Sequence, residues 1–369
     1  MKLSLSTDEL LTQLQTATRV ASSRSSVQAL SGVLISATGE TPMLLATDME
    51  VGLKVPLAGE IVQPGLAVLP ARLLLEVARS LPAETVTLEL RPAEQDVELI
   101  SGPSKFHLRT LRAEDFPELP TPDPASGVKL PTQVFVETAL QVARSASKDE
   151  TRPVLTGVLV SAAGQELTMV ATDSYRLSVK HATLESPLDG TVEANVPARA
   201  LQELARIAQA GDEPELRVGV GQNQVVFEIG EIVLSSRLID GQFPNYRQLL
   251  PESVEHELRL ASAEIADVVR RVSLLAQKNA PLRLSFAEGE LTVSAQTPDI
   301  GEASEALPVP FSGEPFDIGF NPEFLRDGLE SVESDDLVLK LISPLRPGLI
   351  ESPDGGGFVY LIMPIRLNS

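Results

Sequence analysis

"LPARLLLEVARSL" spans residues 69–81, and "VPARALQELARIA" spans residues 196–208. The two stretches share a Pro-Ala-Arg start, the same apolar spacing and a late Ala-Arg pair, and they lie 127 residues apart. Such self-similarity at a fixed offset indicates that one structural unit has been duplicated within the chain.

Other landmarks recur at almost the same offset. Ala-Thr-Asp occurs at 46–48 and 171–173, and Phe-Pro occurs at 116–117 and 243–244. A third copy is recognisable by pattern: "HELRLASAEIADVVRRVSLLAQ" after residue 255 repeats the start of the other two, and "IGFNPEFLRDGLESV" falls where another Pro-Ala-Arg helix belongs. We therefore predict three similar domains, at residues 1–125, 126–250 and 251–369.

Each predicted domain reads as a strand, a helix, several strands, a second helix and more strands. The first helix is indicated by the helical spacing of Leu10, Leu11, Leu14 and Ala17 after a Ser-Thr-Asp start. Alternating runs predict half-buried strands, namely "TVTLEL", "DVELIS", "VVFEIG", "IVLSSRL" and "LTVSAQ". The fold class expected is α+β, with two helices against antiparallel strands in every domain.

Composition excludes several classes of protein. The chain has no cysteine, so disulfides and thiolate metal sites are excluded and a reducing cytoplasm is expected. Three scattered histidines, His107, His181 and His256, are too few for a histidine-rich metal cluster. No apolar run is long enough for a membrane span, and "MKLSLSTDELL" does not resemble a signal peptide. We expect no metal, no cofactor and no membrane association.

The net charge of −21 is distributed unevenly. The predicted helical segments 7–24, 70–81, 131–152, 197–210, 262–280 and 321–331 together carry +1, so the remaining residues carry −22. Arginines seven residues apart share one face of a helix. These face-sharing residues are Arg72 with Arg79, Arg199 with Arg206, and Arg270 and Arg271 with Lys278. They are either solvated side chains opposite a core face or, if the repeats pack side by side, one continuous basic strip.

Four motifs carry a family resemblance: "RPVLTGV" at 152–158, "ATDSYRL" at 171–177, "LIDGQFPNYRQLLP" at 238–251 and "YLIMPIRL" at 360–367. In this order and at these intervals the chain resembles the bacterial sliding clamp, the beta subunit of DNA polymerase III, over essentially its whole length. The resemblance implies a head-to-tail homodimer that closes into a six-domain ring around double-stranded DNA without reading its sequence. Helices would line a hole roughly 25 Å wide, given helices about 9 Å apart. Implied partners are the polymerase III alpha subunit, the ATP-dependent clamp loader and other proteins of replication and repair that carry a clamp-binding motif.

The resemblance also implies DNA contacts at Arg24, Lys148 and Arg152, besides the helix arginines named above. Some members carry paired tyrosines after that last arginine, whereas this chain has Pro153 and Val154. This chain therefore offers no aromatic ring at this point for stacking on an exposed base. The alternative for Arg152 is an ion pair with Asp149 or Glu150.

A peptide-binding pocket for clients is implied between the second and third domains. Its matching positions are Leu155, Thr172, Tyr175, Arg176, Leu177, Pro244, Leu249, Leu345, Met363, Pro364, Ile365 and Arg366. Plain core packing by the terminal strand would explain "VYLIMPI" equally well.

The resemblance implies a subunit contact between the first domain of one chain and the third domain of the other. Candidates for its apolar centre are Val77, Phe106, Leu274 and Leu275, and candidates for its charged rim are Lys105, Arg109, Glu302 and Glu305.

Two rival functions remain at this point. Asp48 and Asp173 would suit acid–base or metal chemistry in an enzyme, but each precedes a turn, where aspartate commonly bonds the backbone. No P-loop, catalytic triad or metal spacing accompanies them, so we expect a non-catalytic subunit. The other rival is a repeat-built scaffold that binds proteins and not DNA.

Overall fold

The fold is taken from a computed structural model, which describes residues 1–22, 25–121, 127–276, 280–298, 300–353 and 356–367. Its contacts divide the chain into two compact units. Unit 1 comprises Met1–Gln133 and Glu203–Leu238, and unit 2 comprises Val134–Gln202 and Ile239–Ser369. The division falls inside the two helices of the middle repeat, α3 (Thr132–Ala143) and α4 (Ala198–Gln209).

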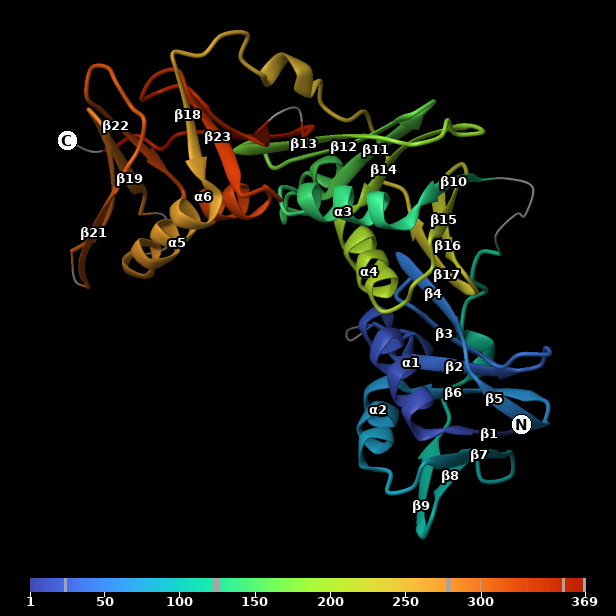
Figure 1. The fold of residues 1–369 in the computed structure, drawn as a ribbon. Helices are drawn as coiled ribbons and strands as arrows, with labels where there is room; N and C mark the ends of the chain where they lie inside the picture. The colour runs from blue at the N-terminus through green and yellow to red at the C-terminus, as the bar shows by residue number, and fades with distance from the viewer. Residues whose placement is uncertain (23–24, 122–126, 277–279, 299, 354–355, 368–369) are drawn as a thin grey trace. The chain divides into compact units, whose positions relative to one another are not determined.

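Unit 1 contains two antiparallel sheets, with α1 (Thr7–Val20) and α2 (Ala71–Ser80) packed against each other (Figure 1). The five-stranded sheet has the order β5-β1-β7-β8-β9 and the eight-stranded sheet has the order β10-β15-β16-β17-β4-β3-β2-β6. Pairing of β17 with β4 joins strands of the first and middle repeats into one sheet. The strands are β1 (Lys2–Ser6), β2 (Gly32–Ala37), β3 (Met43–Thr47), β4 (Val51–Pro56), β5 (Gly59–Gln63), β6 (Gly65–Pro70), β7 (Thr85–Arg91), β8 (Asp96–Ser101), β9 (Ser104–Arg109), β10 (Val128–Pro131), β15 (Glu215–Val220), β16 (Gln224–Ile229) and β17 (Ile232–Arg237).

Unit 2 repeats this design around α5 (Ser262–Val272) and α6 (Pro322–Glu330) (Figure 1). Its eight-stranded sheet has the order β14-β11-β12-β13-β25-β24-β23-β18, and its four-stranded sheet has the order β21-β20-β19-β22. Pairing of β13 with β25 joins the middle and third repeats, as β17 and β4 join the first two. The strands are β11 (Gly157–Ala163), β12 (Glu166–Thr172), β13 (Arg176–Thr183), β14 (Thr191–Pro197), β18 (His256–Ala261), β19 (Leu282–Ala287), β20 (Glu290–Thr297), β21 (Gly301–Pro308), β22 (Phe316–Phe320), β23 (Asp336–Leu341), β24 (Gly348–Glu351) and β25 (Phe358–Ile362).

The helices begin and end for local reasons. The Ser6 hydroxyl accepts a hydrogen bond from the Glu9 N–H at 3.4 Å and so caps α1. The Asn321 side chain caps α6 by accepting from the N–H groups of Glu323 and Phe324 at 2.9 and 3.2 Å. On α2 the apolar residues of one face are buried, whereas Arg72 and Arg79 are exposed.

The α+β prediction is confirmed, and every strand predicted from alternation is present. The predicted helices 131–152 and 262–280 were too long, because α3 ends at Ala143 and α5 at Val272. After α3 the chain is held by short-range polar bonds: the Asp149 N–H donates to the Ser147 hydroxyl at 3.1 Å, and the Thr151 N–H donates to Asp149 Oδ1 at 3.0 Å. Such side-chain bonds compete with helix continuation. Among the described helices, none is both long and apolar enough to cross a membrane.

Candidate functional site

The second Ala-Thr-Asp motif forms a tight turn between β12 and β13. The Thr172 hydroxyl donates to the Arg176 carbonyl oxygen at 2.6 Å, and Asp173 Oδ1 accepts from the N–H groups of Tyr175 and Arg176 at 2.9 and 3.0 Å. These bonds hold Ser174 at φ +80°, a conformation that non-glycine residues rarely adopt. The turn therefore fixes the side chains of Tyr175 and Arg176 at the end of the sheet.

Arg176 is a buried cation, with only 4% of its surface exposed. Its guanidinium donates to Asp173 Oδ2 at 3.0 Å, to Asp327 Oδ2 on α6 at 2.6 Å and to the carbonyl oxygen of Arg144 at 2.6 Å. It also lies 4.3 Å from the ring centroid of Phe324. Within unit 2 this one side chain links β13, α6 and the end of α3.

The charge state of this cluster follows from its surroundings. Burial opposes ionisation of Arg176, but the carboxylates of Asp327 and Asp173 outweigh it, so the pKa of the guanidinium is raised. Burial raises the pKa of the Tyr360 hydroxyl, which donates to the Phe324 carbonyl oxygen at 2.7 Å. At physiological pH the Arg176 side chain is therefore charged and the Tyr360 side chain is neutral.

Apolar side chains are exposed beside this buried cluster. Tyr175 is 61% exposed and Met363 is 41% exposed, and the Met363 N–H donates to the Tyr175 carbonyl oxygen at 2.9 Å. The Tyr175 ring is stacked at 6.5 Å from Phe324. Leu345, which is 66% exposed, lies in the turn before β24, whose first residue Gly348 pairs with Ile362 next to Met363. We call Tyr175, Leu345 and Met363 the apolar rim.

The other residues predicted for this pocket divide into buried and exposed sets. Leu155, Thr172 and Leu177 are buried. Leu249 is 51% exposed, and Pro244, two residues before the buried Tyr246, is also exposed. After β25 the tail leaves this sheet, because the Ile365 N–H donates to the Gly319 carbonyl oxygen of β22 at 2.7 Å. Pro364 and Ile365 are half-buried, and Arg366 is exposed. The sequence analysis did not predict a role for Phe324. Its only indication in the sequence is its position three residues after Asn321, which caps α6.

The loop expected to contact DNA is held by a polar network. Arg152 Nε donates to Asp149 Oδ2 at 3.0 Å and Arg152 Nη1 donates to the Ser174 hydroxyl at 3.1 Å, so the alternative of an ion pair with Asp149 is present. Hydrogen bonds from Thr151 and then from Arg152 lower the pKa of Asp149. Lys148 is far more exposed and lies 3.7 Å from a Glu323 carboxylate oxygen. Arg24 and Lys278 lie outside the described residues.

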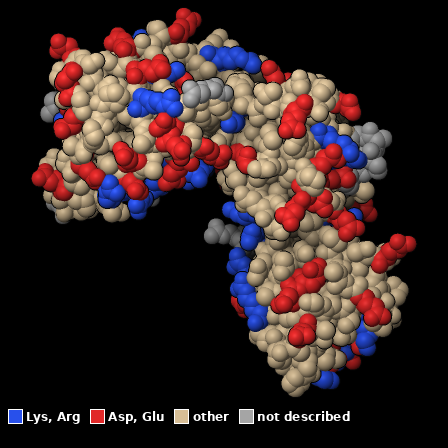
Figure 2. Space-filling model, in the orientation of Figure 1, with Lys and Arg blue, Asp and Glu red and all other residues tan. Residues whose placement is uncertain are grey.

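The helix arginines are all exposed but differ in their partners. Within the described chain, no carboxylate lies within 4 Å of Arg72 or Arg79. By contrast, Arg270 Nη2 donates to Asp267 at 2.9 Å, and Arg271 forms a bidentate pair with Glu305 at 2.6 and 3.0 Å. On α4, Arg206 pairs with Glu203. Arg199 is exposed but is not without an interaction partner. Figure 2 shows Lys and Arg gathered on the side of unit 1 where α1 and α2 lie.

The predicted subunit-contact residues lie on or beside two edge strands. Lys105, Phe106 and Arg109 are on β9, the edge of the five-stranded sheet, and Glu302 and Glu305 are on β21, the edge of the four-stranded sheet. Leu274 is 80% exposed and Leu275 is half-buried, whereas Val77 is mostly buried on α2. The structure adds Ile300, 56% exposed, to the apolar residues near β21. Glu305 pairs with Arg271 within this chain, so a basic side chain of another chain would compete with Arg271 for it.

Both aspartates that were considered as catalytic residues, Asp48 and Asp173, bond the backbone of their own turns. Asp48 Oδ1 accepts from the N–H groups of Glu50 and Val51 at 3.0 and 2.8 Å, as Asp173 does in the second copy. Both carboxylates therefore have structural partners in their own turns. The described part of the chain contains no group of three or more His, Asp or Glu side chains positioned to hold a metal ion.

Solved structures with this architecture define the class. A sliding clamp from Bartonella birtlesii, solved bound to griselimycin, superposes with a TM-score of 0.92 at 27% identity over the whole of both chains. The Bacillus subtilis DNA polymerase sliding clamp does so with a TM-score of 0.90 at 29% identity, again over both whole chains. The fold is that of the DNA sliding clamps.

Sequence comparison identifies the family. Profiles of the N-terminal, central and C-terminal domains of the DNA polymerase III beta subunit match residues 1–120, 129–245 and 247–366. The Streptomyces coelicolor beta sliding clamp is 33% identical over the full length of both chains, and the Bacillus subtilis one is 31% identical over 99% of this chain and all of its own. The chain belongs to the DNA polymerase III beta subunit family, the beta sliding clamps of DNA replication.

We predict that Arg176→Met destabilises the protein by roughly 3 kcal/mol, because it leaves the mostly buried carboxylates of Asp173 and Asp327 without the cation that they share. Equilibrium urea unfolding measures the change. Arg346→Met, on an exposed loop, is the matched control and should shift stability by less than about 0.5 kcal/mol. Equal stability of the two variants would contradict the role given to the buried cluster.

Proposed function

We propose that this chain is the subunit of a closed, head-to-tail homodimeric ring that encircles double-stranded DNA without reading sequence and tethers the replicative polymerase. The observation that carries the proposal is the exposed, carboxylate-free arginine pair on α2 in a chain of net charge −21 that belongs to the sliding-clamp family. The proposed domains are residues 1–125, 126–250 and 251–369. The ring acts in the cytoplasm as a non-catalytic accessory subunit of the polymerase.

The proposed DNA contact is electrostatic and loose. Lys and Arg that meet phosphates give affinity that does not depend on sequence and that falls with salt. Arg72 and Arg79 are available for phosphates because no described carboxylate competes for them. Arg270 and Arg271 are already paired with acids, so they contribute less attraction. A grip this weak permits sliding, and closure of the ring keeps the protein on its DNA.

The proposed subunit contact joins β9 of one chain to β21 of the other. Each is an edge strand with unpaired backbone N–H and C=O groups, and such edges readily pair with another chain. Leu274 and Ile300 supply exposed apolar surface beside β21, and the half-buried Phe106 supplies part of its ring on β9. The two surfaces differ, so the contact is heterologous and closes only at the correct angle.

The proposed client site is the apolar rim together with Leu249 and Pro364. Exposed Tyr and Met side chains over a rigid, hydrogen-bonded turn suit a short peptide, because methionine adapts to different side chains and the buried Arg176 network fixes the base. Clients proposed for it are the polymerase III alpha subunit, the ATP-dependent clamp loader and other proteins with a clamp-binding motif. A relative from Bartonella birtlesii that binds griselimycin supports a ligand site in this family.

The topological grip predicts different behaviour on circular and linear DNA. A ring placed by its loader on a primed circle should co-elute with the circle in gel filtration and be lost when the circle is cut. A circle that is nicked, and so stays closed, is the control. Retention on linear DNA with free ends would refute encirclement.

The α2 arginines should dominate the salt dependence of binding. Arg72→Gln with Arg79→Gln should reduce the slope of log K against log salt by about 0.9 per lost phosphate contact, measured on a primed duplex. The matched control is Arg259→Gln with Arg283→Gln, which removes the same charge from two strands, where each arginine pairs with an aspartate. Equal slopes for the two variants would contradict a helix-lined DNA surface.

The subunit contact is tested at its apolar centre. Leu274→Glu with Leu275→Glu should give monomers in sedimentation velocity, because two charges would enter a desolvated contact. Val62→Glu, at a residue that is 55% exposed on β5, is the control and should sediment as a dimer. A dimer in both variants would place the interface elsewhere.

The client site is tested at the apolar rim. Tyr175→Ser with Met363→Ser should weaken binding of a peptide from the alpha-subunit tail by at least about 30-fold, the effect of one hot-spot residue. Fluorescence anisotropy measures it, and Val220→Ser, at another exposed apolar residue, is the control. Unchanged affinity in the double variant would remove the rim from the client site.

A further inference from the structure

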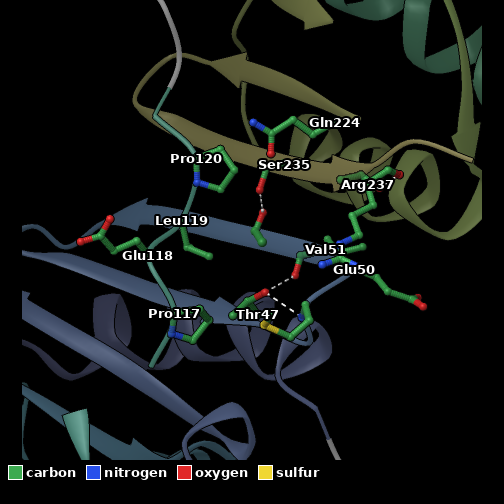
Figure 3. Close-up of a pocket in the computed structure, with 13 residues that line it drawn as sticks. Thr47, Glu50, Val51, Pro117, Glu118, Leu119, Pro120, Gln224, Ser235 and Arg237 are labelled. Atoms are coloured by element: carbon green, nitrogen blue, oxygen red, sulfur yellow. Dashed lines mark hydrogen bonds between the residues drawn. The ribbon is translucent and has the colours of Figure 1, made fainter. Parts of the chain in front are cut away.

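A pocket of about 160 Å³ opens in unit 1, whereas the residues of the apolar rim belong to unit 2. Its walls come from the turn after β3, from the segment Pro117–Pro120 and from β16 and β17 (Figure 3). Met49, Val51, Leu119, Ser235 and Arg237 are among the lining residues. The proposed function assigns no role to this pocket.

The pocket is the internal-repeat counterpart of the apolar rim. The Arg237 N–H donates to the Glu50 carbonyl oxygen at 2.9 Å, as the Met363 N–H does to that of Tyr175. The Thr47 hydroxyl donates to the Val51 carbonyl oxygen at 2.8 Å, and Met49 adopts φ +78°. Backbone geometry is therefore shared at the two sites, while the side chains differ.

The pocket exists because three side chains are smaller than their counterparts. In unit 2, Leu177, Leu361 and Tyr246 pack together in one buried cluster. Strand register and the repeated Phe-Pro motif place Gly52, Ser235 and Leu119 at the matching positions. A Cβ on Gly52 would lie 2.7 Å from Ser235 Oγ and 3.0 Å from a methyl carbon of Leu119, so these residues meet as their counterparts do. Leucine in place of tyrosine, and glycine and serine in place of leucine, reduce the side-chain volume here, and the pocket opens beside Leu119 and Ser235.

The rim of the pocket carries one available cation. Arg237 is exposed, and within the described residues no carboxylate lies within 4 Å of it. Glu50 and Glu118 also line the pocket, but Figure 3 shows their carboxylate ends directed away from it. An aromatic ring in the hollow would thus have a positive charge beside it and no carboxylate turned toward it.

We propose that this pocket binds a partner peptide through one aromatic side chain with a carboxylate close to it in the sequence. The ring enters the pocket against Met49, Val51 and Leu119, beside the closely packed Gly52 and Ser235. The carboxylate pairs with Arg237, which is better placed for an acidic than for a basic partner. The protein would then hold two different peptides per chain, one at each copy of the turn.

Methionine methyl NMR separates the two sites, because Met49 lines this pocket and Met363 lies on the apolar rim. The full-length protein, labelled with ¹³C on its five methionine methyls, is titrated with N-acetyl-Tyr-Asp-amide. We expect the Met49 signal to shift in a saturable way, and N-acetyl-Ala-Asp-amide to leave it in place. No Met49 shift up to the solubility of the probe, or a shift of Met363 alone, would overturn the proposal.

Three variants test the assigned parts. Leu119→Tyr restores the ring of the second copy and should abolish the Met49 shift, and Ser235→Leu, which restores the other counterpart, guards against misfolding of the first variant. Arg237→Met should weaken binding roughly tenfold, the order of one charge-assisted hydrogen bond. Tyr175→Ser should change nothing at Met49, so failure of the client site and of this pocket are distinguishable. Binding that survives both filling variants would contradict the proposal.

Discussion

The separation of charge between helices and strands is the constraint on which the account depends. A chain of net charge −21 can attract DNA only where cations are presented without competing carboxylates. The net charges of the helices do not show which arginines meet this condition, because some arginines are paired with carboxylates. Arg72 and Arg79 on α2 meet it, whereas Arg271 on α5 is held in a bidentate pair by Glu305. In the proposed ring, attraction to DNA would therefore differ from one repeat to the next, as a loose contact requires.

A second constraint is the Thr-Asp turn, which the chain uses twice. Asp48 and Asp173 each bond two backbone N–H groups, and each turn holds a residue at positive φ. In the second copy the turn is backed by Arg176, whose position is taken by Val51 in the first copy. One backbone design therefore supports a packed cluster with an exposed apolar rim in unit 2 and a hollow in unit 1.

Much of this was predictable from sequence, for identifiable reasons. Repeats and alternation predicted the α+β fold, because side-chain periodicity directly reports buried faces. The length of α3 was not predictable, since it ends in a turn in which the Ser145 and Ala146 N–H groups donate to the carbonyl oxygens of Val142 and Ala143, and no sequence motif marks this turn. Ion pairs between residues far apart in the sequence could not be predicted either: Asp327 lies 151 residues from Arg176, and Glu305 lies 34 residues from Arg271. The pocket in unit 1 could not be predicted from the sequence, because the pairing of β4 with β17 decides which small side chains lie next to one another.

Single-particle electron microscopy of the purified protein tests the central claim most directly. The account predicts a closed annulus of two chains, with α2 and α4 on the wall of a hole wide enough for duplex DNA. Their arginines would then face the hole, and the acidic strands would form the outside. An open chain of domains, or a ring whose α2 helices face outward, would contradict the account.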